Sequence, residues 1–150
     1  FGVIGSEANS IQPKKRMLSA MTPTIVLKNN KPHLILGSPG GPSIITSVFQ
    51  TILNVLEYNM NVNDAVSSPR FHHQWYPDLI VMEDEAYSND LNSILNQKNY
   101  LIVKLPIEGD TLGVYKRSDI GAVDAILIDD NGKVFGGPDL RREHYSSAIE

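Results

Sequence analysis

The segment GSPGGP, residues 37–42, could do chemistry through its backbone alone. Apolar residues precede and follow it, which is typical of a buried strand that gives way to a helix. Its glycines could form a tight turn, bind a phosphate, or present two backbone N–H groups to the negative charge that develops in acyl transfer. The spacing fits neither GxxxxGK nor GxGxxG, and no Lys follows, which argues against phosphate. The turn and the oxyanion hole both stay open.

Two adjacent histidines, His72 and His73, are candidates for a general base or a metal site. Neighbouring side chains on a strand point to opposite faces, and no acidic residue lies at a recognisable ligand spacing, so we predict no metal site. We expect the histidines and their neighbours to be structural or to contact another subunit. Those neighbours are Arg70, Gln74 and Trp75.

A hairpin and a helix are predicted around the glycine segment. Residues 24–28 and 33–36 have the composition of two strands, and the turn residues at 29–32 would connect them. A helix is predicted over about 42–58, because apolar residues recur at three- and four-residue steps. Its expected buried face consists of Ile45, Val48, Ile52, Val55 and Leu56.

Two shorter helices are predicted from their capping residues. Asn61 could cap a helix that must end near Pro69, since the residue before a proline disfavours helical geometry. Ser88 could cap another helix. The expected buried face of that second helix consists of Leu91, Ile94 and Leu95.

The C-terminal third reads as strands. Residues 101–103 and 125–128 are short apolar runs that suit buried strands. The sequence DDNG at 129–132 predicts a hairpin turn before a further strand at 133–135. Strands, helices and strands again, without regular alternation, indicate an α+β fold.

The composition bounds the class of protein. With 150 residues, 41% of them hydrophobic and 20% charged, the chain can form one domain, assigned to residues 1–150. A net charge of -4 argues against a nucleic-acid partner. There is no Cys, which excludes disulfides and thiolate metal sites, and no apolar run approaches the roughly 18–20 residues of a membrane span. The first residue is Phe1 rather than Met, so we expect a piece of a longer protein.

Several motifs in one order carry a resemblance to a known family. They are RMLSAMTPTIVL at 16–27, the glycine segment, SPRFHHQW at 68–75 and NGKVFGGPDLRR at 131–142. With them the chain resembles the later part of the small subunit of the gamma-glutamyltranspeptidase family, most weakly over 87–116. The resemblance implies an α+β fold that is part of the four-layer αββα sandwich of N-terminal-nucleophile hydrolases.

The family's chemistry implies what this chain contributes. In that family a precursor cleaves itself, and the new N-terminal Thr of the small subunit is the nucleophile, with its own α-amino group as the base. This mechanism needs no histidine base, no metal and no organic cofactor. Because the chain begins at Phe1, we expect a fragment of the small, catalytic subunit that lacks the nucleophile segment and is inactive alone.

The resemblance implies which residues of this chain correspond to the site residues of the family. The oxyanion-hole glycines match Gly40 and Gly41, where the missing Cβ atoms would let substrate approach. The serine pair that holds the substrate's α-carboxylate matches Ser19 and Ala20, of which only Ser19 has a hydroxyl. Losing one hydrogen bond to a charged group costs about 1.5–3 kcal/mol. Met21, which follows the pair, is interpreted as a packing residue.

The other charged clusters are expected to be structural or solvated. Asp139 with Arg141 and Arg142 resembles the family's C-terminal motif and should form a structural salt bridge. The acid pair at 129–130 should be exposed in its turn, and no carboxylate dyad of the glycosidase type stands out. The basic run at 14–16 is expected to be a solvated loop or a subunit contact.

The leading hypothesis is a gamma-glutamyl hydrolase and transferase that cleaves amides such as glutathione through a gamma-glutamyl-enzyme. Ala20 motivates an alternative, a glutaryl or cephalosporin acylase or a poly-gamma-glutamate-processing relative. An inactive homologue kept as an assembly module is the third hypothesis. The expected partners are the large subunit and the remainder of the small subunit from the same precursor. The resemblance also implies a periplasmic, secreted or cell-surface location.

Overall fold

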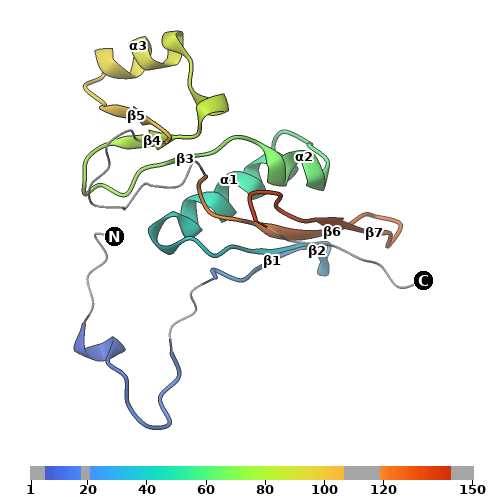
Figure 1. Cartoon of the computed structure of the whole chain (residues 1–150). Helices are drawn as coiled ribbons and strands as arrows, with labels where there is room; N and C mark the ends of the chain where they lie inside the picture. Colours follow the sequence, from blue (N-terminus) through green and yellow to red (C-terminus); the bar gives the residue numbers. More distant parts are fainter. Residues whose placement is uncertain (1–5, 18–20, 107–118, 143–150) are drawn as a thin grey trace.

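The structure is a computed structural model that describes residues 6–17, 21–106 and 119–142. A four-stranded sheet with helices on one face forms the larger part, and a three-stranded sheet with one helix lies beside it (Figure 1). This arrangement confirms the predicted α+β class. No helix of the described part combines the length and the apolar character that crossing a bilayer requires.

The hairpin before the glycine segment forms as predicted, with a shorter turn. Strand β1 (Thr24–Lys28) pairs antiparallel with β2 (Lys31–Gly37). Only two residues connect them, because Asn29 and Asn30 both adopt positive φ values, 52° and 60°, which suit the tight turn of a twisted hairpin. Lys31 is therefore already part of the second strand.

The four-stranded sheet runs in the order β1-β2-β6-β7, and all its neighbours are antiparallel. Strands β6 (Asp124–Ile128) and β7 (Val134–Gly137) are joined by the predicted turn, in which the Asp129 carboxylate accepts hydrogen bonds from two backbone N–H groups. Helices α1 (Ile44–Leu56) and α2 (Val62–Ser67) cover one face. The core between them contains Leu34, Leu36, Val48, Val55, Val62, Val66, Val123 and Ala125.

Helix α1 buries Val48 and Val55 as predicted and packs Ile52 against the core, but the rest of its buried face differs from the prediction. A 3-10 turn, η2 (Gly41–Ser43), precedes it, and its buried residues are Ile44, Ser47, Val48, Thr51 and Val55. Ile45, which the prediction buried, is 68% exposed. The buried stripe includes two hydroxyls, each satisfied by donating to the carbonyl four residues earlier at 2.8 and 3.0 Å. A prediction based on apolar residues alone does not include buried serines and threonines. The predicted buried face was therefore displaced around the helix axis.

The smaller sheet has the order β3-β4-β5. It contains β3 (Phe71–His72), β4 (Ile80–Met82) and β5 (Ile102–Lys104), with β3 and β4 antiparallel and β4 and β5 parallel. Between β4 and β5 the chain forms the 3-10 turn η3 (Asp84–Ala86) and helix α3 (Asn89–Gln97).

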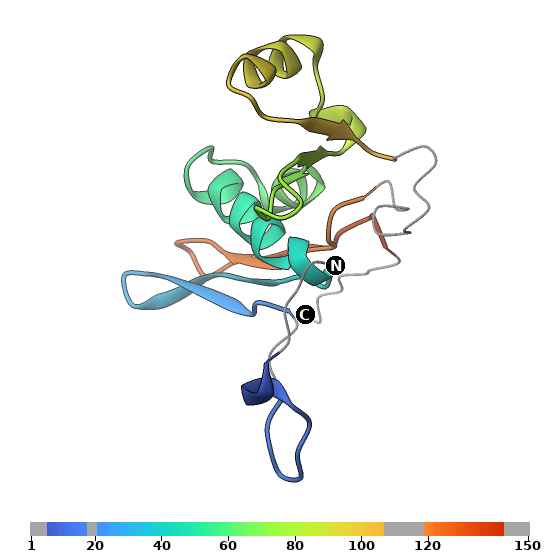
Figure 2. The same cartoon turned by 90° about the vertical axis from the view of Figure 1, so that its left-hand side faces the viewer.

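Both predicted caps are present, whereas the predicted burial of α3 is wrong. The N–H of Asp64 donates to Asn61 Oδ1 at 2.9 Å, and the N–H of Leu91 donates to Ser88 Oγ at 3.1 Å. No residue of α3 is buried, and Ile94 is 53% exposed. The helix lies at the outer end of the molecule, where the described chain offers it little to pack against (Figure 2).

The face of the four-stranded sheet opposite the helices is apolar and open. Ile25, Ile35 and Ile126 pair in register across three strands, and the first and last are 63% and 42% exposed. Figure 2 shows that helices α1 and α2 lie on the other side of the sheet. Apart from the 3-10 turn η1 (Glu7–Asn9), residues 6–17 extend away from the sheet and are exposed, including the basic run at 14–16.

Candidate functional site

The glycine segment connects the end of β2 to the start of α1. Gly40 has φ 144° and Gly41 has φ 59°, a region that favours glycine. A Cβ atom at Gly40 would lie 2.9 Å from Ser43 Oγ and 3.0 Å from Gly121 Cα. Glycine at position 40 is thus required by the conformation and by close packing. The expectation that its missing Cβ serves substrate approach is wrong for this residue, because that atom would point into the protein.

The carbonyl groups of Pro39 and Gly40 accept hydrogen bonds from nearby serine hydroxyls. Ser38 Oγ donates to Pro39 O at 2.7 Å, and Ser43 Oγ donates to Gly40 O at 2.9 Å. No residue of the described part accepts a hydrogen bond from the backbone N–H of Gly40 or Gly41. Two neighbouring donors therefore stand at the N-terminal end of the η2–α1 helix, where the helix dipole favours negative charge.

Met21, the residue after the predicted carboxylate-binding pair, contacts this turn. Ser19 and Ala20 themselves lie outside the described residues. Their neighbour Met21 accepts a hydrogen bond on its carbonyl oxygen from the N–H of Ser38 at 2.9 Å. The residue that follows the predicted pair is therefore hydrogen-bonded to the residue two positions before Gly40. The Met21 side chain, interpreted from the sequence as a packing residue, is 44% exposed.

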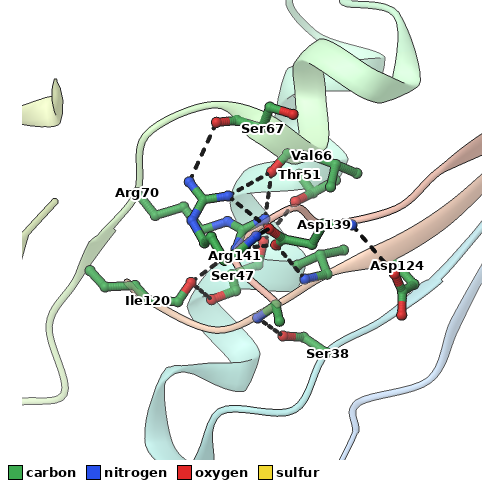
Figure 3. A network of polar contacts seen from close by, with 12 residues as sticks. Ser38, Ser47, Thr51, Val66, Ser67, Arg70, Ile120, Asp124, Asp139 and Arg141 are labelled. Atoms are coloured by element: carbon green, nitrogen blue, oxygen red, sulfur yellow. Dashed lines mark hydrogen bonds and ion pairs between the residues drawn. The ribbon is translucent and has the colours of Figure 1, made fainter. Parts of the chain in front are cut away.

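Arg70, Arg141 and Asp139 form a network of polar contacts close to Ser38 (Figure 3), and Glu83 adds a second carboxylate to it. The Arg70 guanidinium donates to Asp139 Oδ2 at 2.8 Å and to the carbonyls of Ile120 and Val66 at 2.9 and 2.7 Å. Burial, and then the charge of Arg141, lower the pKa of Arg70. The contacts confirm that Arg70 is structural, because its guanidinium joins α2 to the chain before β6.

The predicted salt bridge of Asp139 forms with Arg141 and includes a residue that the sequence did not indicate, whereas no ion pair of Arg142 occurs among the described residues. Arg141 donates to Asp139 Oδ1 at 3.2 Å and forms a two-pronged contact with Glu83 at 2.8 and 2.7 Å. Glu83 also accepts from the N–H groups of Arg70 and Ile120. In the sequence, the only indication of a role for Glu83 was its position as an acidic residue directly after the apolar strand β4.

The network pairs two positive with two negative side chains, and it holds the Asp139 carboxylate ionised. Burial alone would raise the pKa of Asp139, but the charge of Arg70 and the hydrogen bonds from Arg141 bring that pKa below its usual range. No group of three or more metal-binding side chains occurs among the described residues. Two charges of each sign, joined by several hydrogen bonds, suit a structural role, although the buried Arg70 Nε has no hydrogen-bond partner among the described residues.

The adjacent histidines have separate surroundings. His72 is buried, with Nδ1 2.8 Å from Thr46 Oγ1 and Nε2 2.9 Å from Gln74 Oε1. His73 Nε2 lies 3.0 Å from Asp78. Burial lowers the pKa of His72, so its imidazole is neutral at pH 7. These contacts support a structural role for the pair.

Comparison with known proteins assigns the chain to a family. It matches the family described as gamma-glutamyltranspeptidase over residues 1–149. It is 37% identical over 141 residues to the glutathione hydrolase proenzyme of Escherichia coli strain K12, covering 94% of this chain and 22% of that protein. It is 39% identical over 137 residues to the proenzyme of Bacillus subtilis strain 168, covering 91% and 21%. The chain thus spans about a fifth of the length of these relatives.

Solved structures give the fold. A threonine-to-alanine variant of Helicobacter pylori gamma-glutamyltranspeptidase is 44% identical, with a TM-score of 0.75 over 94% of this chain and 71% of that one. The Pseudomonas nitroreducens enzyme complexed with L-DON is 31% identical, with a TM-score of 0.77 over 99% and 72%. A cephalosporin acylase from Bacillus halodurans, 21% identical with a TM-score of 0.69 over 85% and 22%, shares the fold alone.

The fold is therefore that of the N-terminal-nucleophile hydrolases, as the sequence motifs implied. Within that class, the chain belongs to the gamma-glutamyltranspeptidase family.

Proposed function

We propose that this chain supplies the oxyanion hole and part of the substrate pocket of a gamma-glutamyl hydrolase and transferase. The observation that carries the proposal is the Gly40–Gly41 turn, with two adjacent N–H groups that lack an acceptor in the described structure. The substrate class is supported by relatives named glutathione hydrolase, at 37% and 39% identity. The acylase and poly-gamma-glutamate alternatives have less support, because the cephalosporin acylase shares only the fold.

The proposed reaction balances without a metal or organic cofactor. The hydroxyl oxygen of an N-terminal Thr outside this chain bonds to the γ-carbonyl carbon, while its proton passes to the Thr α-amino group. The carbonyl oxygen becomes negative and accepts hydrogen bonds from the N–H groups of Gly40 and Gly41. The C–N bond then breaks, the amine leaves with the proton, and an ester remains. Water releases glutamate from that ester, or an amino acid takes the gamma-glutamyl group.

Ser19 is proposed to hold the substrate's α-carboxylate. Met21, two residues further along the chain, accepts a hydrogen bond from the N–H of Ser38 in the glycine segment, which supports a carboxylate site close to the oxyanion hole. Ala20 supplies no second hydroxyl, so we expect weaker gamma-glutamyl binding than in a relative with two serines.

The proposed partners are the large subunit and the rest of the small subunit from one precursor. Relatives named proenzymes support a precursor. The open row of Ile25, Ile35 and Ile126 supports a further layer of protein on that face of the sheet. A periplasmic, secreted or cell-surface location is proposed from the family resemblance.

The test is amide hydrolysis by the full precursor that contains this segment, with gamma-glutamyl and glutaryl p-nitroanilides side by side. We expect self-cleavage, visible by mass, and preference for the gamma-glutamyl substrate. In the matched variant Ala20→Ser, the KM for that substrate should fall about 10- to 150-fold, as one hydrogen bond of about 1.5–3 kcal/mol to a charged group predicts. Preference for glutaryl would support an acylase, and a precursor that never cleaves itself would support an inactive homologue.

A further inference from the structure

We propose that Ser38 and Ser43 are positioning residues that orient the two N–H donors of the oxyanion hole. The inference rests on the proposed role of Gly40 and Gly41. Each serine holds the carbonyl oxygen of the peptide unit whose N–H belongs to one of these glycines.

The first peptide unit joins Pro39 to Gly40. Its carbonyl oxygen accepts a hydrogen bond from Ser38 Oγ at 2.7 Å, and Ser38 Oγ in turn accepts from the N–H of Ala122 at 3.0 Å. Ser38 is fully buried, beneath the chain that leads into β6 (Figure 3). The carbonyl and N–H of a trans peptide point in opposite directions. A carbonyl fixed toward Ser38 therefore leaves the Gly40 N–H pointing away from the interior.

The second peptide unit joins Gly40 to Gly41. Its carbonyl oxygen accepts from Ser43 Oγ at 2.9 Å and from the Ser43 N–H at 3.3 Å. Both contacts hold this carbonyl toward the first turn of the helix. By the same planar geometry, the Gly41 N–H points to the opposite side. The two serines thus fix the orientation of both N–H donors by binding the carbonyl on the opposite side of each peptide unit. Neither hydroxyl needs to contact the substrate.

Such restraint matters because the turn consists of glycines. Glycine populates positive and negative φ values about equally, so a peptide unit between flexible residues can rotate at little cost. Rotation would replace an N–H by a carbonyl oxygen and would present negative charge to the oxyanion. A hydroxyl that donates to the carbonyl also polarises the amide, which strengthens its N–H as a donor. Ser38 and Ser43 oppose the rotation and strengthen the donors that remain.

The experiment compares turnover of self-cleaved, full-length enzyme with and without each hydroxyl. Removal of a whole oxyanion donor costs about 100- to 1000-fold in kcat, so loss of its orientation in Ser38→Ala or Ser43→Ala should cost about 10- to 100-fold. The KM for gamma-glutamyl p-nitroanilide and the inhibition constant of the product glutamate should stay within about twofold, because both report ground-state binding. Ser43→Thr, which keeps the hydroxyl, should restore kcat.

Ser47→Ala is the matched control. Ser47 is an equally buried serine in the same region, and its hydroxyl donates to Ser43 O rather than to either glycine peptide unit. Its loss should leave kcat within about twofold of the parent, well short of the cost of losing an oxyanion donor. An equal loss of kcat in Ser47→Ala would show that packing alone matters and would overturn the inference.

The outcomes separate this inference from the proposed function. A parent enzyme that hydrolyses gamma-glutamyl amides, with Ser38→Ala and Ser43→Ala equally fast, leaves the function standing and refutes the positioning role. A self-cleaved parent without that hydrolysis refutes the function itself. Should Ser38→Ala fail to yield self-cleaved enzyme, the comparison of Ser43→Ala with Ser43→Thr decides the question.

Discussion

At the scale of single residues, Asp139 is the buried carboxylate that pairs with both arginines of the network. Its carboxylate lies beside Arg70 and Arg141 and accepts the N–H of Val123 at 2.7 Å. In Asp139→Asn the Arg70 guanidinium would stay buried without its counter-charge, which costs about 3–5 kcal/mol of unfolding free energy. Urea unfolding of the full-length protein measures this loss. In the double variant with Arg70→Met the losses should be less than additive, and strict additivity would contradict the coupling.

His72 makes the stability depend on pH near neutrality. Burial lowers its pKa in the folded state below the value of about 6.5 in the unfolded chain. The unfolded state therefore binds the proton first as the pH falls, so stability is full above about pH 6.5 and is lost below it.

The variant His72→Gln should show a smaller decrease in Tm between about pH 7.5 and pH 5.5, because glutamine cannot titrate at that site. His73→Gln removes the partly exposed neighbour and should keep most of the decrease. A decrease in Tm that is unchanged in His72→Gln and abolished in His73→Gln would reverse this assignment.

At the scale of elements, Gln50 on helix α1 completes the edge of strand β3. Its side-chain amide donates to Phe71 O at 2.8 Å and accepts from the Phe71 N–H at 3.1 Å, as a neighbouring strand would. Gln50→Ala removes both hydrogen bonds and should lower the unfolding free energy by about 1–3 kcal/mol. The control Gln97→Ala, on the exposed end of α3, should change it by less than about 0.5 kcal/mol. Equal effects in chemical denaturation would contradict the edge role.

Elements governed by short-range interactions could be predicted from the sequence, and those governed by distant polar contacts could not. Asn61 and Ser88 cap helices through N–H groups three residues away, which sequence spacing contains. Ser47 is buried in α1 because the chain at 120 lies against it, which no local pattern records. The predicted helix face was therefore wrong where it ignored hydroxyls.

The candidate site also contains features that the sequence predicted and features that it did not. The glycine pair was visible as a motif, because backbone chemistry requires that residue type. The hydroxyls of Ser38 and Ser43 were quoted with the motif but had no assigned role, since their acceptors become evident only once the peptide planes are placed. Glu83 was missed because its partner Arg141 lies 58 residues away in sequence.

At the scale of the whole molecule, the four-stranded sheet has helices on one face and an open row of isoleucines on the other. Ile25 and Ile126 are 63% and 42% exposed, and burial of such side chains is worth about 25 cal/mol per Å².

We expect the 150-residue chain made alone to self-associate through this face. In sedimentation velocity, Ile25→Thr with Ile126→Thr should shift it toward monomer, whereas Ile94→Thr on α3 should not. The double substitution should also lower the Tm of the full-length protein, where we propose that a further layer covers the row. A wild-type chain that is monomeric and unfolds cooperatively by itself would show that the face needs no partner.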